Sequence, residues 1–268
     1  MIEESNEIVS LILQKIANLL NSGFGAALAG AFFGALAASY FADRFERRQL
    51  LTRQLVAGNA ATSLAIAIFQ HSLGFKDQLR PFIVESYFED RNRLIRFLEK
   101  EPRPSIFEVE YNFGTVGMFR AEVDKLLDLV ILQASADQKV VMASTFLMQT
   151  VHALDRSLST RNEVLMSLAS IQKSVSEIDF ARSFFGIEDA SGNVDMRLFE
   201  ATKAIDTQLD DTIFYSKLIA ENQSTRNAEI AKAIGRSSPS PIIFKFDKSA
   251  IERLLPDESN YPDWVQQA

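Results

Sequence analysis

The chain has no cysteine, and it has only two histidines and one tryptophan among 268 residues. Disulfide bonds, thiol nucleophiles and cysteine metal sites are therefore excluded. The sequence also lacks the phosphate-loop pattern GxxxxGKS/T, the dinucleotide pattern GxGxxG and the nucleophile pattern GxSxG. No catalytic signature replaces them. Proline is missing from the chain before Pro81, so nothing in the N-terminal stretch blocks a long helix.

An excess of positive charge is also missing. The formal net charge is −7, and the basic residues form no extended stripe outside the segment from Arg44 to Arg53. Because nucleic-acid binding needs a concentrated positive surface, we expect no nucleic-acid partner. Hydrophobic residues make up 47% of the chain and charged residues 24%. This composition is sufficient for one domain of roughly 190 residues with a hydrophobic core.

Charge is absent altogether from residues 23–42, GFGAALAGAFFGALAASYFA, and three arginines lie in the six residues that follow. Twenty helical residues at about 1.5 Å each match the ~30 Å hydrocarbon core of a bilayer. The segment therefore predicts a single membrane-spanning helix. Two other interpretations remain open: a signal peptide cleaved near residues 37–39, which the acidic N-terminus disfavours, and a buried core helix.

The predicted span has a bulky side and a small side. On a helix, Phe24, Leu28, Phe32, Leu36 and Tyr40 follow one ridge. The opposite side is smooth enough for another backbone to approach, and it includes a GxxxG pair, which favours self-association or packing on a partner helix. The residues predicted to pack there are Gly23, Ala26, Ala27, Gly30, Ala31, Gly34, Ala35 and Ala38.

Basic residues predict the orientation of this helix. Arg44, Arg47 and Arg48 follow the span directly, whereas the residues before it are mostly acidic. The positive-inside rule then places the larger C-terminal part in the cytoplasm, behind the inner membrane. We expect these three arginines and Tyr40 to lie at the membrane interface, with the bilayer as a partner.

The fold class predicted for the chain is all-α. Apolar periodicity indicates helices over about 115–134, 136–184 (split near 157–160) and 195–234, with Asp195 as an N-cap and a break at Pro81. Alternating residues near 106–113 predict an extended piece on the core. A second span over 54–75 remains an alternative. The expected parts are an amphipathic helix at 1–22, the span at 23–42, a juxtamembrane helix at 43–75, a cytoplasmic helical domain at 76–235 and an arm at 236–268.

Candidate chemistry is sparse, and we predict no catalytic, cofactor or metal site. His152, Asp155 and Arg156 share one helical face, but so few partners indicate an interhelical or surface cluster. The acidic spacing from Asp189 to Glu200 partly matches a calcium loop. The glycine required at its sixth position is Val194, so a turn before a helix is the better interpretation.

The order of features resembles bacterial single-pass inner-membrane proteins of unassigned role. A span, an arginine-rich exit, a helix with Asn59 and the stretch from Phe75 to Pro81 carry this resemblance over about the first eighty residues. It implies a cytoplasm-facing helical protein and transfers no active residue. We expect a non-enzymatic, self-associating binding, sensing or scaffold component, which can have a cytoplasmic protein partner. A membrane-perturbing effector and a membrane-tethered enzyme of unrecognised class are the alternatives.

Overall fold

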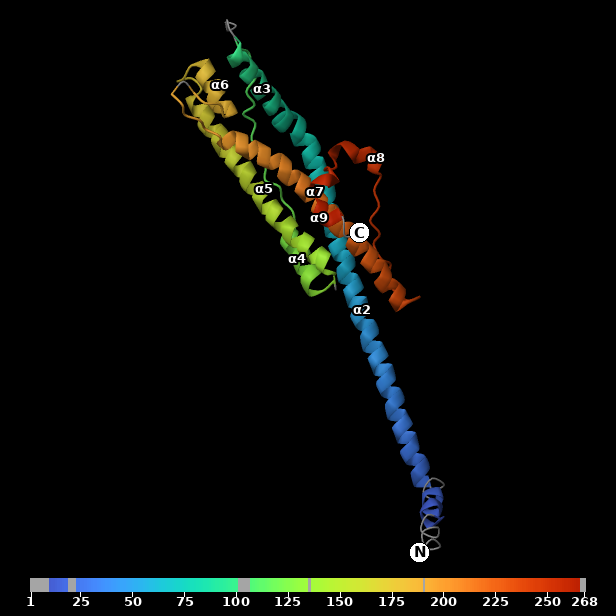
Figure 1. Ribbon diagram of the computed structural model, residues 1–268. Helices are drawn as coiled ribbons and strands as arrows, with labels where there is room; N and C mark the ends of the chain where they lie inside the picture. Colours follow the sequence, from blue (N-terminus) through green and yellow to red (C-terminus); the bar gives the residue numbers. More distant parts are fainter. Residues whose placement is uncertain (1–9, 19–22, 101–106, 135, 190, 266–268) are drawn as a thin grey trace. The chain divides into compact units, whose positions relative to one another are not determined.

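The computed structural model describes residues 10–18, 23–100, 107–134, 136–189 and 191–265, and the side chains of residues 23–26 lie outside this description. Every regular element in the described part of the chain is helical (Figure 1). The all-α prediction is therefore confirmed. Residues 10–18 form part of the amphipathic helix predicted at 1–22, whereas residues 1–9 and 19–22 lie outside the described residues.

The chain divides into two compact units, Met1–Thr52 and Arg53–Ala268, and helix α2 (Gly23–Leu79) contributes to both. The second unit therefore includes the C-terminal part of α2 as well as the residues from 76 onwards. The reason is burial, because Leu55, Ala61 and Ala65 of α2 are completely buried in the core of this unit. Apolar side chains that can be covered in this way stabilise a folded unit.

Small residues in α2 allow close packing on helix α7 (Arg197–Ile234). A Cβ atom placed on Gly58 would lie 2.1 Å from Oδ1 of Asn227 on α7, a distance that no real side chain tolerates. Ala57 and Ala61 are buried beside it. This packing accounts for the alanine-rich composition of residues 54–75 without a second membrane span.

Pro81 does not end the helical path, so the prediction of a break there was wrong. A π-helical turn, η1 (Arg80–Glu85), follows α2 directly and leads into helix α3 (Ser86–Glu99). The backbone N–H of Ser86 donates to the carbonyl oxygen of Pro81, five residues earlier. The wider turn accommodates a residue that lacks an N–H donor, and the chain stays helical on both sides.

Four further helices build the body of the second unit: α4 (Val123–Leu132), α5 (Gln138–Ile171), α6 (Glu177–Phe185) and α7. Helices α5 and α7 pack along each other (Figure 1). The split predicted near residues 157–160 is absent, because Leu158 and Arg161 lie on the buried face of an uninterrupted α5. Helix α7 has nearly the predicted extent. Its N-cap is Met196, while Asp195, the predicted cap, accepts a hydrogen bond from the backbone N–H of Arg197.

An aromatic core joins α3, α5, α6 and the segment 107–113. Phe180, Phe184 and Phe185 of α6 are buried there against Tyr87. Within 107–113 the odd-numbered residues are half-buried and the even-numbered ones are exposed. The described part of the predicted extended piece is therefore confirmed, and residue 106 lies outside it.

The C-terminal arm packs on helix α2 of the same unit through hydrogen bonds of its backbone and through ring contacts. Asn59 of α2 donates from Nδ2 to the Ser240 carbonyl oxygen (2.9 Å) and accepts at Oδ1 from the Ile242 N–H (2.9 Å). The ring centroids of Phe244 and Phe246 lie 5.5 and 5.6 Å from that of Phe69. Short helical turns follow: α8 (Lys248–Ile251), η2 (Glu252–Leu254), η3 (Glu258–Asn260) and α9 (Pro262–Val265).

Candidate functional site

The apolar ridge of α2 is exposed in the first unit. Leu28, Phe32, Leu36 and Tyr40 follow one another at four-residue intervals and are between 51% and 62% exposed. Phe33 and Phe41 on the neighbouring ridge are 67% and 66% exposed. A run of exposed aromatic and leucine side chains of this length is the kind of surface that proteins use to contact a membrane or another protein.

The small side of the same helix is exposed as well. A Cβ atom added at Gly30 or Gly34 would meet no atom within 4 Å. Ala27, Ala31, Ala35 and Ala38 are exposed around these glycines, whereas the side-chain positions of Gly23 and Ala26 lie outside the description. No packing partner within the described chain therefore accounts for the glycines.

Basic side chains follow the apolar stretch. Arg44, Arg47 and Arg48 are exposed, and none of them forms an ion pair with a described carboxylate. Tyr40 lies one turn earlier, with its ring centroid 5.9 Å from that of Phe41. An aromatic pair followed by free guanidinium groups matches the chemistry of a lipid headgroup region.

Within the described part of the chain, no helix is both long and apolar enough to cross a membrane.

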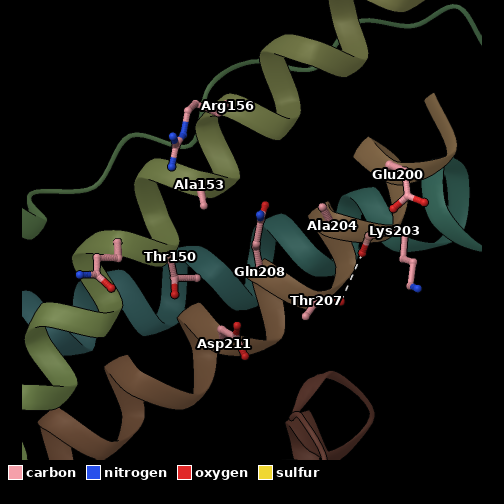
Figure 2. A pocket seen from close by; sticks show the side chains of 10 residues that line it. Thr150, Ala153, Arg156, Glu200, Lys203, Ala204, Thr207, Gln208 and Asp211 are labelled. Atoms are coloured by element: carbon pink, nitrogen blue, oxygen red, sulfur yellow. Dashed lines mark hydrogen bonds between the residues drawn. The ribbon is translucent and has the colours of Figure 1, made fainter. Parts of the chain in front are cut away.

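A polar groove lies between α5 and α7 in the second unit (Figure 2). Ala153 and Ala204 line it together with longer polar side chains, and its volume is about 670 Å³. Arg156 and Lys203 supply positive charge, and Glu200 and Asp211 supply negative charge. The remaining lining residues are Gln149, Thr150, Thr207 and Gln208.

Hydrogen bonds engage several of the polar side chains that line this groove. The Thr207 hydroxyl donates to the Lys203 carbonyl oxygen at 3.3 Å (Figure 2). No lining hydroxyl in the described structure donates to a carboxylate or an imidazole, the arrangement that activates an oxygen nucleophile. Asp211 accepts a 2.7 Å hydrogen bond from the Tyr261 hydroxyl, and burial raises the pKa of this carboxyl above its usual range.

His152 and Asp155, which share one face of α5, contact different partners. Nε2 of His152 lies 3.8 Å from Oδ1 of Asp124 on α4, and both side chains are exposed. Asp155 instead accepts a 2.7 Å hydrogen bond from the Phe119 backbone N–H. Among the described residues, no group of three or more acidic or histidine side chains converges to hold a metal ion.

The segment after α6 forms a turn, as its sequence suggested. Oδ1 of Asp189 accepts hydrogen bonds from the backbone N–H groups of Ser191 (2.8 Å) and Asn193 (2.9 Å). These bonds hold the pKa of the Asp189 carboxyl below its usual range. The carboxylate is therefore engaged in turn formation before α7, which is a common role for aspartate.

One residue escaped the sequence analysis. Arg161 lies on the buried face of α5 and lines a small cavity. The signal was present, because Arg161 continues the helical spacing of Leu154, Leu158, Leu165 and Leu168. A charged residue at a core position marks a site that needs a polar partner.

Comparison with known proteins gives no relative: no family model, curated protein or solved structure matches this chain.

Proposed function

We propose that the protein is a non-enzymatic helical component that associates with a membrane and with copies of itself through the first unit. The second unit serves as a binding or sensing domain. The observation that carries this proposal is the exposure of both sides of α2 over residues 27–42, where neither the apolar ridge nor the glycines have a partner in the described chain.

The distribution of side chains supports a division of roles on α2. The ridge from Leu28 to Tyr40 faces lipid, and the side with Gly30 and Gly34 packs on the same helix of another copy. Arg44, Arg47 and Arg48 contact headgroups on the cytoplasmic face of the inner membrane. In this arrangement residues 23–42, of which the side chains of residues 23–26 lie outside the described part of the chain, form a single span.

The polar groove between α5 and α7 supports the binding role of the second unit. Its alanines allow close approach, and its charges of both signs provide directional contacts for a cytoplasmic protein partner.

A membrane-perturbing effector is the second candidate, and the segment 10–18 favours it. Leu11, Ile12, Leu13 and Ile16 are at least half exposed on this short helix. An amphipathic helix of this kind inserts its apolar face into a bilayer interface. Many copies assembled through α2 would then open a leak, whereas a scaffold needs only a few.

Flotation with lipid vesicles tests the membrane contact. The intact chain should float with vesicles that contain phosphatidylglycerol, and Leu36→Glu should reduce the floating fraction at least tenfold, because a charge at the centre of a span costs about 3 kcal/mol. Leu132→Glu is the matched control, since Leu132 is 74% exposed in the second unit. Equal flotation of both variants would contradict the proposal.

A further inference from the structure

A second, larger groove lies within the second unit, between the start of α5, the C-terminal half of α7 and the short helical turns that end the described chain. Its volume is about 1450 Å³. It is distinct from the polar groove of Figure 2, because the two grooves have no lining residue in common. We therefore consider its chemistry separately.

Apolar side chains line this groove and remain accessible to solvent. Met142 and Phe146, one turn apart on α5, are 45% and 42% exposed. Trp264 of α9 is half-buried, and its ring centroid lies 5.7 Å from that of Phe146 in an edge-to-face arrangement. Accessible aromatic rings beside a flexible methionine form a surface that is suited to contact with another protein.

The same groove carries an excess of negative charge. Five carboxylates and three basic side chains line it: Asp137, Glu221, Glu229, Glu258 and Asp263, with Lys139, Lys217 and Arg226. Two of the three cations are already paired within the chain. Nζ of Lys217 donates a 2.6 Å hydrogen bond to Oε1 of Glu258. Nη1 of Arg226 lies 3.0 Å from Oε2 of Glu229.

These pairs leave two carboxylates of the groove without a close cation. Glu221 has only a long contact, 3.9 Å, with the Lys217 amine that already bonds to another carboxylate. Asp263 forms no ion pair with a described residue. Lys139 is also unpaired within the described chain, but Asp137 lies two residues before it at the same end of α5. The net charge of the groove therefore favours a cationic occupant.

We propose that this groove binds a basic segment of a partner protein through arginine side chains. A guanidinium stacks on aromatic faces, which Phe146 and Trp264 supply here. Its positive charge is complementary to Glu221 and Asp263. An acidic segment would instead place like charges together, which costs several kcal/mol at an interface. The inference rests on the binding role proposed for the second unit and specifies the charge of the partner.

The fluorescence of Trp264 tests this site, because Trp264 is the only tryptophan and lines the groove. The probe is a short peptide of alternating alanine and arginine, added to the intact chain in nanodiscs of phosphatidylcholine. Binding should shift the Trp264 emission saturably, and added salt should weaken it because salt screens the attraction. A peptide of the same length with alternating alanine and glutamate is the control and should leave the emission unchanged.

Two variants with the same substitution on α5 locate the contact. Met142→Lys places a positive charge in the groove and should weaken binding of the arginine peptide about tenfold or more. Met166→Lys changes a methionine that is 60% exposed further along α5, and it should bind the peptide as the wild type does.

Three results would overturn the proposal: no saturable change in emission with the arginine peptide, an equal response to the glutamate peptide, or equal affinities of the two variants. Flotation with vesicles does not involve this groove. A failure here is therefore distinguishable from a failure of the membrane contact proposed for the first unit.

Discussion

Glycine has two different roles along α2, and they separate at single residues. At Gly58 the neighbouring α7 leaves no room for a side chain, whereas the surroundings of Gly30 and Gly34 are empty within 4 Å. In the sequence, all three are simply glycines in an alanine-rich segment. Only the packing distinguishes the glycine at which a side chain would clash from the two that have no neighbour in the described chain.

Substitution at these glycines should therefore have different effects on the stability of the second unit. Gly58→Ala should lower the free energy of unfolding by about 1–3 kcal/mol, because its Cβ would overlap Asn227. Gly30→Ala should leave the second unit unchanged, since it only improves helix propensity in the first. Urea unfolding followed by the fluorescence of Trp264, the only tryptophan, reports on the second unit. A Gly58→Ala variant as stable as the wild type would contradict this packing.

Asp211 should make stability depend on pH. Burial raises its pKa in the folded state above the ordinary value of 3.8, so the folded chain binds the proton more tightly than the unfolded chain. The contribution of this group is fully present below pH 3.8 and is lost as pH rises through the folded pKa. Asp211→Asn keeps a side-chain oxygen that can accept the Tyr261 hydrogen bond, and it removes the loss of stability because asparagine does not titrate. The stability of the variant relative to the wild type should increase from pH 4 to pH 7 in urea unfolding, and a difference that does not change with pH would contradict the assignment.

At the scale of the elements, the position of the C-terminal arm on α2 depends on a few polar contacts. Asn59→Ala removes both hydrogen bonds to its backbone, at Ser240 and Ile242. Removal of such hydrogen bonds usually costs about 1–3 kcal/mol, so the arm should detach from α2 more often. Tryptic cleavage at the exposed Lys245 should therefore accelerate about tenfold or more. Asn222→Ala is the control, because the Asn222 side chain bonds only to Leu218 within its own helix. Equal cleavage of the two variants would show that Asn59 does not hold the arm.

Local patterns predicted the helices well and their junctions poorly. The extent of α7 and the alternation over 107–113 follow from apolar spacing, which the sequence displays directly. The π turn at Pro81 and the continuity of α5 near residue 158 depend on contacts with other helices. The sequence likewise did not show that residues 55–73 pack inside the second unit, because an alanine-rich helix fits a bilayer and a tight helix interface equally well.

At the scale of the whole molecule, the two units divide the proposed tasks. The second unit buries apolar side chains in its core clusters, and those of residues 61–73 of α2 are among them. The first unit leaves its apolar ridge and its glycines uncovered within the described residues. We propose that lipid and further copies of the chain cover this surface, which is the central claim.

The mass of the intact protein in lipid nanodiscs tests that claim most directly. The account predicts more than one chain per nanodisc for the wild type and one chain for the double variant Gly30→Leu, Gly34→Leu, since leucine would separate the helices. Leu132→Glu, which alters an exposed position in the second unit, should assemble as the wild type does. Five or more copies would favour the effector. A wild type with a single chain, or a double variant with the same mass as the wild type, would contradict self-association through α2.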